Sequence, residues 1–134
     1  MTSYRPIMID RQIDQIFDEA LRTIGSSGDW TPMCNVWDDE NGFYVQLAVP
    51  GWEASQVSLE VNDQVLTMKG ERPEAAAEGR YHLREIGGTS FSRRIKLPAF
   101  VDQSKARATH SNGLMTITFP KREEAKPRRI LIES

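Results

Sequence analysis

The chain of 134 residues is poor in the side chains that most often carry out chemistry, since it has one cysteine and two histidines. A single cysteine, Cys34, cannot form an internal disulfide, which suits a reducing compartment. His82 and His110 match no metal-ligand spacing, either with each other or with Cys34. We therefore expect these residues to bind no metal.

Two further absences argue against an enzyme. The sequence has no G-x-x-x-x-G-K-[ST] phosphate loop, because the Gly-Gly-Thr-Ser run at 87–90 lacks the lysine. The carboxylates at 38–40 stand in a predicted turn, where solvated acids are more common than an acid/base pair. We expect neither a catalytic site nor a cofactor.

The chain also lacks a strong charge of one sign and a long apolar run. Its formal net charge is −2, whereas surfaces that bind nucleic acid or anionic lipid need a positive field. No segment reaches membrane-spanning length, and residues 1–12 lack the apolar run of a signal peptide. We expect a cytoplasmic protein with no nucleic-acid partner and no integral membrane association.

Residues 1–31 carry one amphipathic helical pattern. Its apolar residues recur at three- and four-residue spacing, and they are Ile9, Ile13, Ile16, Phe17, Ala20, Leu21 and Ile24. The Gly-Ser-Ser-Gly run at 25–28 predicts the end of this helix and a loose hinge. The helix is either docked on the core or held loosely and free to meet partners, and the pattern leaves both open.

Residues 32–120 contain short segments in which apolar and polar side chains alternate, as in half-buried strands. The segments are 43–49, 57–61, 65–70, 91–97, 105–111 and 114–119. Asn41-Gly42 and Asn112-Gly113 predict hairpin turns with positive φ, and Met33, Met68 and Met115 are predicted to fill the core. About seven short strands at this spacing predict an all-β, immunoglobulin-like β-sandwich.

A connection at residues 72–90 is long for a compact domain, and such loops are uncommon unless they have a function. Its middle carries the strand-like residues Tyr81, Leu83 and Ile86. The segment is either a mobile surface loop or a strand that pairs with the sheet edge of another subunit.

Arg93 interrupts an apolar strand face, because it shares the phase of Phe91 and Ile95. A guanidinium on such a face needs a carboxylate partner or a subunit interface. Glu85, in the long connection, is the candidate partner across a dimer seam.

Residues 121–134 form a charged extension that ends in an aliphatic segment. Seven of the nine residues from Lys121 to Arg129 are charged, so we expect the extension to be solvated and flexible. In an extended conformation Ile130 and Ile132 point to one side and Leu131 to the other. This geometry suits a hook that adds a strand to a sheet edge and places two side chains in adjacent pockets.

Five motifs in order along the chain resemble the α-crystallin domain of the small heat-shock proteins, over residues 32–121. LAVPGW resembles the family's strand followed by Pro-Gly, and VLTMKGER resembles V-L-x-I-x-G-E-R. SFSRRIKLP resembles S-F-x-R-x-(aliphatic)-x-L-P, and ARATHSNGLMTITFPK resembles A-x-x-x-N-G-V-L-x-I-x-x-P-K. The terminal ILI matches the family's I-x-I motif.

The resemblance implies a bacterial, archaeal or plant-like dimer, in which the segment from Arg80 to Ile86 is swapped onto the partner subunit. The implied dimer-interface residues are Tyr81, Leu83, Arg84, Glu85 and Arg93. It also implies that Ile130 and Ile132 dock on another dimer, in a groove whose implied lining is Val57, Leu59, Val61, Ala106 and Ala108. Because the N-terminal arm is short for the family, we expect a dimer or a small assembly.

The resemblance further implies an ATP-independent holdase chaperone, which covers the apolar surface of unfolding client proteins under stress. The groove vacated by a released hook would bind clients together with helix residues Ile9, Ile13, Ile16, Phe17 and Leu21. Two alternatives stay open. One is a co-chaperone or adaptor sandwich that binds a defined partner, and the other is a structural assembly protein.

Overall fold

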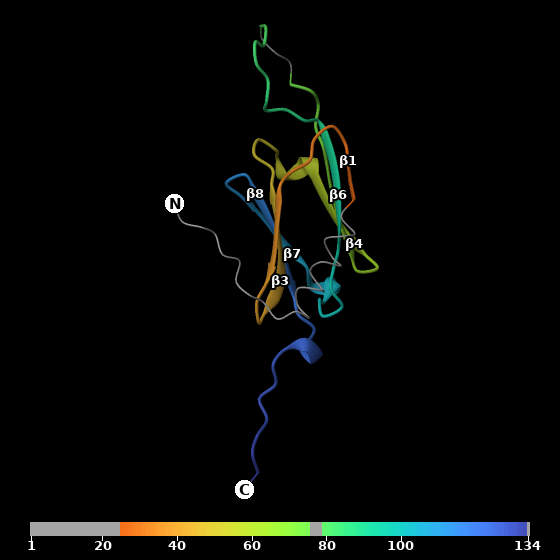
Figure 1. The fold of residues 1–134 in the computed structure, drawn as a ribbon, viewed down its shortest axis with the longest axis vertical. Coiled ribbons are helices and arrows are strands. Elements are labelled where there is room, and N and C mark those ends of the chain that lie inside the picture. The colour runs from red at the N-terminus through yellow and green to blue at the C-terminus, as the bar shows by residue number, and fades with distance from the viewer. Residues whose placement is uncertain (1–24, 76–78, 134) are drawn as a thin grey trace, which may run out of the picture.

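A computed structural model describes residues 25–75 and 79–133 (Figure 1). The predicted helix at 9–24, with its proposed client-binding residues, lies outside this part of the chain. Eight described strands form two antiparallel sheets, ordered β1-β6-β5-β4 and β2-β3-β8-β7. The strands are β1 Gly25–Ser27, β2 Cys34–Asp38, β3 Gly42–Ala48, β4 Val57–Asn62, β5 Val65–Glu71, β6 Ser90–Lys96, β7 Arg107–Ser111 and β8 Leu114–Pro120.

The predicted all-β sandwich is confirmed, and its core follows the predicted alternation. Every second residue of β3 and β8 faces the opposite sheet, because successive side chains of a strand point to opposite faces. β5 and β6 supply the facing side chains. The buried apolar residues are Phe43, Val45, Leu47, Val49, Trp52, Leu66, Met68, Phe91, Ile95, Leu97, Val101, Met115, Ile117 and Phe119.

The two predicted Asn-Gly turns differ in the structure. Asn112 and Gly113 have φ angles of 54° and 76°, which confirms the predicted turn between β7 and β8. The prediction of positive φ at Asn41-Gly42 is wrong. There the Asp39 carboxylate accepts hydrogen bonds from the backbone N–H groups of Asn41 and Gly42, at 2.8 and 2.9 Å, and this Asx turn reverses the chain without left-handed residues.

The Gly-Ser-Ser-Gly run is not a loose hinge, which corrects the prediction. Gly25–Ser27 forms β1 and pairs with Ser92–Arg94 of β6, so it covers an edge that would otherwise leave backbone groups unpaired. Gly28, with φ 107°, lies so close to β6 that an added Cβ would stand 2.5 Å from the carbonyl oxygen of Ser90. The small residues serve close packing here, and the sheet begins before the predicted domain boundary at residue 32.

The prediction for the methionines is confirmed at two positions and wrong at one. Met68 and Met115 are buried, whereas Met33 is 78% exposed. Met33 precedes β2, where its carbonyl accepts a hydrogen bond from Ala48 N–H. Its neighbour Cys34 packs against the core, and alternation therefore turns the Met33 side chain to solvent.

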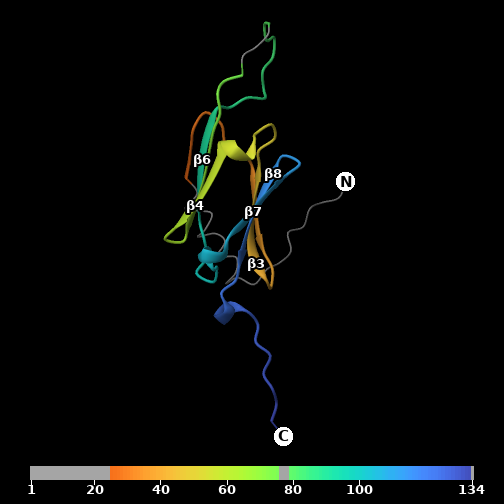
Figure 2. The same cartoon turned by 180° about the vertical axis from the view of Figure 1, so that it is seen from behind.

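Two segments project from the sandwich at opposite ends, as both ribbon views show (Figures 1 and 2). One is the connection between β5 and β6, whose described residues form no strand. The other is the C-terminal extension. Its root is held at Arg122, whose backbone N–H donates to Phe100 O at 2.8 Å and whose Nε donates to Val101 O at 3.3 Å.

Candidate functional site

The predicted groove residues belong to two edge strands. Val57, Leu59 and Val61 lie on β4, pair with core-facing residues of β5, and are half-buried against the core. Ala108 on β7 stands opposite the buried Ile117. Opposed residues share a sheet face, so Ala108 also lies on the inward side of its sheet.

The inward side of β7 is open, since all five residues of the strand are exposed. Ala108 is exposed although its cross-strand neighbour is buried, and Ala106, just before the strand, is exposed as well. The sandwich therefore leaves the small apolar side chains of Ala106 and Ala108 accessible at a sheet edge.

The projecting loop presents apolar side chains to solvent. Tyr81, Leu83 and Ile86 are 53%, 75% and 89% exposed. Arg84 lies over the Tyr81 ring, 5.0 Å from its centroid, and its Nη1 is 3.5 Å from a carboxylate oxygen of Glu74. These apolar side chains are interspersed with the polar residues His82, Arg84 and Glu85, and the described residues of the loop form no strand.

Arg93 lies on the inward side of β6, opposite Met68. Its Nη1 donates to the carbonyl oxygen of Pro32 at 2.8 Å. Its Nε is buried and has no hydrogen-bond partner in the described part of the chain. Glu85 is exposed on the loop and makes no ion pair with Arg93 within the described residues.

The half-buried Cys34 also lies near Arg93. Burial raises the pKa of its thiol, and the positive charge of Arg93 partly opposes that shift. A raised pKa keeps the thiol protonated and weakly nucleophilic at neutral pH. Within the described residues, no cluster of three or more histidine, cysteine, aspartate or glutamate side chains can hold a metal ion.

The C-terminal hook is fully presented to solvent. Ile130, Leu131 and Ile132 are 85%, 86% and 95% exposed and lie in a stretch without regular structure. The extension leads away from the sandwich (Figure 2), so the hook does not occupy the groove residues of its own chain.

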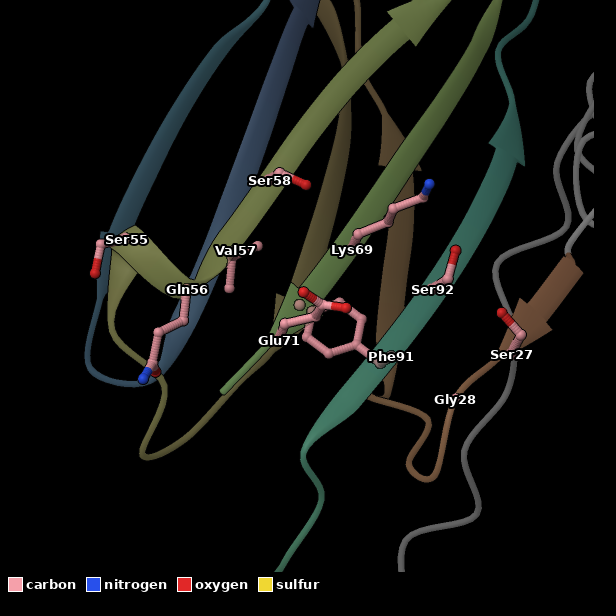
Figure 3. Close-up of a pocket in the computed structure, with 11 residues that line it drawn as sticks. Ser27, Gly28, Ser55, Gln56, Val57, Ser58, Lys69, Glu71, Phe91 and Ser92 are labelled. Carbon is pink, nitrogen blue, oxygen red and sulfur yellow. The ribbon is translucent and has the colours of Figure 1, made fainter. Parts of the chain in front are cut away.

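A shallow hollow of about 640 Å³ lies on the outer face of the β1-β6-β5-β4 sheet (Figure 3). Ser27, Ser58, Lys69 and Ser92 line it, with Glu71 at one end. The hollow carries one amine and one carboxylate but neither histidine nor cysteine, so its residues match no nucleophile–base arrangement.

The sequence patterns did not predict the hydrogen-bonded residues at the base of the projecting loop. The Asp29 carboxylate accepts hydrogen bonds from Thr89 Oγ1 at 2.6 Å and from the N–H groups of Thr89 and Ser90 at 2.9 Å. Arg72 contacts three backbone carbonyls and lies over Trp52. These partners are up to 61 residues apart, and no local pattern connects them.

We expect the carboxyl carbon of Asp29 to titrate with a midpoint of about 2 in a ¹³C NMR pH series, because its hydrogen bonds with Thr89 and Ser90 lower the pKa from 3.8. A carboxylate with a lowered folded pKa stabilises the fold above the unfolded value of 3.8 and loses this contribution as pH falls toward 2. Thr89→Val should raise the midpoint. An Asp29 midpoint near 3.8 in the unmodified protein would contradict this geometry.

The two packed sheets, the open edge strands and the projecting segments define an immunoglobulin-like β-sandwich with exposed apolar side chains on its loop and its C-terminal extension. The sequence profile of the Hsp20/alpha crystallin family matches residues 35–133. The chain belongs to this family, the small heat-shock proteins, which are chaperones.

Curated relatives agree with this assignment. Small heat shock protein C2 of Rickettsia felis is 27% identical over 95% of this chain and 88% of its own length. The 18 kDa antigen 2 of Mycobacterium avium is 35% identical over 73% of this chain and 71% of its own length.

Solved structures agree in fold. A small heat-shock protein from Xylella fastidiosa superposes with a TM-score of 0.66 at 28% identity, covering 78% of this chain and 98% of the other. Heat shock protein 16.0 from Schizosaccharomyces pombe gives a TM-score of 0.66 at 28% identity, covering 79% and 100%. In the part of the chain that the structure describes, no helix is long and apolar enough to cross a membrane.

Proposed function

We propose that the protein is an ATP-independent holdase, which binds unfolding proteins in the cytoplasm and prevents their aggregation under stress. The observation that carries the proposal is the set of apolar side chains that are exposed in the described part of the chain: the loop residues Tyr81, Leu83 and Ile86, and the hook residues Ile130 and Ile132. Exposed apolar surface of this kind is typical of sites that bind other polypeptides.

The proposed dimer forms by exchange of the projecting loop. β2, Cys34–Asp38, is the end strand of its sheet and pairs only with β3 within the described chain. Its free edge offers backbone donors and acceptors that the segment Arg80–Ile86 of a second copy can satisfy. In this arrangement Glu85 of one chain is the proposed partner of Arg93 in the other, whose buried Nε has no hydrogen-bond partner among the described residues.

The proposed higher assembly forms when the hook adds to the edges of β4 and β7 in another dimer. Ile130 and Ile132 are two residues apart, about 7 Å in an extended chain. Val57, Leu59 and Val61 repeat at the same two-residue interval along β4. The matched spacing supports the placement of the two isoleucines between successive side chains of the groove, with Ala106 and Ala108 on the opposite wall.

Client binding is proposed to use the same edge after the hook leaves it, together with the apolar residues of the N-terminal arm. A client segment in an extended conformation gains backbone hydrogen bonds at the edge and buries apolar side chains against β4. The highly charged root of the C-terminal extension keeps the loaded complex soluble. No step needs nucleotide.

The direct test is light scattering from a heat-labile client warmed with increasing amounts of the protein, without nucleotide. We expect suppression of scattering near one subunit per client molecule, and no suppression by an equal mass of an inert globular protein. If the folded protein leaves scattering unchanged, the holdase proposal is wrong, and the adaptor that binds a defined partner takes its place.

A further inference from the structure

Arg72 forms several hydrogen bonds at the base of the projecting loop. Its backbone N–H donates to Thr89 O at 2.9 Å, which closes the loop where it leaves the sandwich. Its side-chain nitrogens donate to Gly88 O at 2.8 Å, Gly51 O at 3.1 Å and Gly87 O at 3.4 Å. One guanidinium thus joins both ends of the loop to the turn after β3.

The guanidinium is itself held from one side by an aromatic stack. It lies 4.1 Å from the ring centroid of Trp52, a cation–π contact. Trp30 stacks on Trp52, with centroids 5.7 Å apart and planes 13° apart. At Gly88, an added Cβ would stand 2.7 Å from the Cβ of Trp30, so the chain just before β6 packs directly on this stack.

Asp29, in the segment between β1 and β2, forms a second set of hydrogen bonds to the base of the loop. Its carboxylate accepts from two backbone N–H groups and one hydroxyl at Thr89 and Ser90, and its own N–H faces Ser90 Oγ at 3.4 Å. The start of β6 is therefore tied to the sandwich by a charge-assisted network, and such bonds are stronger than neutral ones.

The far part of the loop has no comparable support. Gly79 has φ 118°, and no atom lies within 4 Å of a Cβ built on it. Arg84 and Glu74, with side chains 35% and 74% exposed, form the only ion pair of the described loop residues. The loop is therefore held by several contacts at its base and by few at its tip. The contacts at the base set the direction in which the loop leaves the sandwich.

We propose that Arg72 and Asp29 are positioning residues for dimer formation: they set the direction in which the loop leaves the sandwich, so that Tyr81–Ile86 reaches the β2 edge of a second copy. The inference rests on the proposed loop-exchanged dimer. A loop fixed at its base loses less conformational freedom on association than a free one, and this pre-organisation raises affinity without adding contacts to the partner.

The test is the dimer dissociation constant, measured by sedimentation velocity over a dilution series. We expect Arg72→Met to weaken the dimer about 10-fold or more, and Asp29→Asn by about 3-fold, because an amide keeps one acceptor oxygen. Arg94→Met is the matched control. Arg94 is exposed on the outer side of β6, and its loss removes the same charge with an expected change below about 2-fold.

Two further variants separate positioning from general stability. If Arg72→Met does not fold, Arg72→Lys keeps the charge but cannot span three carbonyls, and it should weaken the dimer to a smaller degree. In a background with Tyr81, Leu83 and Ile86 all replaced by serine, Arg72→Met should change association no further. A purely structural role would weaken association equally in both backgrounds.

The outcomes distinguish this inference from the proposal on which it rests. A wild-type protein that stays monomeric at every concentration overturns the loop-exchanged dimer and the positioning role together. A dimeric wild type whose Arg72 and Asp29 variants associate equally well overturns the positioning role alone. The positioning role is supported if the Arg72 and Asp29 variants form weaker dimers while their near-ultraviolet circular dichroism spectra match that of the wild type.

Discussion

Replacement of both Ile130 and Ile132 by serine should remove every species larger than the dimer. The two side chains are 85% and 95% exposed in the single chain, so the fold should be unaffected. Full burial of an isoleucine contributes roughly 1.5–3 kcal/mol, and the pair therefore contributes about 3–6 kcal/mol per docked hook. The corresponding loss of affinity is on the order of 10²- to 10⁴-fold.

We expect a single hook to bind weakly, on the order of millimolar, once the ordering of its charged tether is included. We expect several hooks in one assembly to hold by multivalency, while each can leave without the others. Loss of the two isoleucines removes every such contact at once. Size-exclusion chromatography with light scattering should then show one peak at the mass of the dimer.

Leu131→Ser is the matched control, because Leu131 is equally exposed and equally aliphatic but points to the opposite side of an extended chain. It should leave the size distribution nearly unchanged. If Leu131→Ser and the double isoleucine variant change the size distribution equally, the overall apolarity of the segment stabilises the assembly, whichever side its side chains point to. An unchanged size distribution in the double variant would show that the hook plays no part in it.

The same double variant separates a chaperone from a structural protein. A holdase should keep its activity or gain some, because the edge between β4 and β7 is freed for clients. A scaffold should lose its function together with its assembly. Light scattering of a heated client, measured with the wild type and the double variant, makes the comparison.

Local patterns were sufficient for most of the fold. Alternation placed Phe43, Val45 and Leu47 on the core face of β3, and all three are buried. The Asn112-Gly113 dipeptide located the turn between β7 and β8, because few residue pairs accept positive φ at both positions. In an antiparallel sheet with one solvated face, the alternation of apolar and polar residues along a strand shows which side chains face the core.

The wrong prediction of a hinge at 25–28 and the missed contacts of Asp29 and Arg72 have a common physical origin. The strand β1 is made of Gly25, Ser26 and Ser27, which carry no apolar alternation, and its pairing depends on a free edge of β6 that is distant in sequence. The contacts of Asp29 and Arg72 likewise join segments that only the folded chain brings together. Propensity and periodicity describe neighbours along the chain and contain no information about such contacts.

Arg93→Met should weaken the dimer by about 10- to 100-fold and leave the monomer as stable as before or more stable. Within the described residues, Arg93 donates to Pro32 O, whereas its buried Nε has no acceptor. The Arg93 side chain is half-buried, and an apolar side chain of similar length avoids the cost of desolvating the guanidinium while losing one hydrogen bond, that to Pro32 O. The side chain therefore contributes little to the isolated sandwich, and its function is expected at the interface.

The partner of Arg93 is tested by a double-mutant cycle with Glu85→Gln, measured as dimer dissociation constants at two salt concentrations. If Glu85 meets Arg93 across the dimer seam, the two substitutions should be coupled by at least about 1 kcal/mol, since close charge pairs at interfaces reach this range. Arg94→Met, one residue along β6 and directed outward, should show no coupling with Glu85. Additive effects would exclude the pair and direct attention to another acceptor for Nε, whereas an unchanged Arg93→Met dimer would remove Arg93 from the interface altogether.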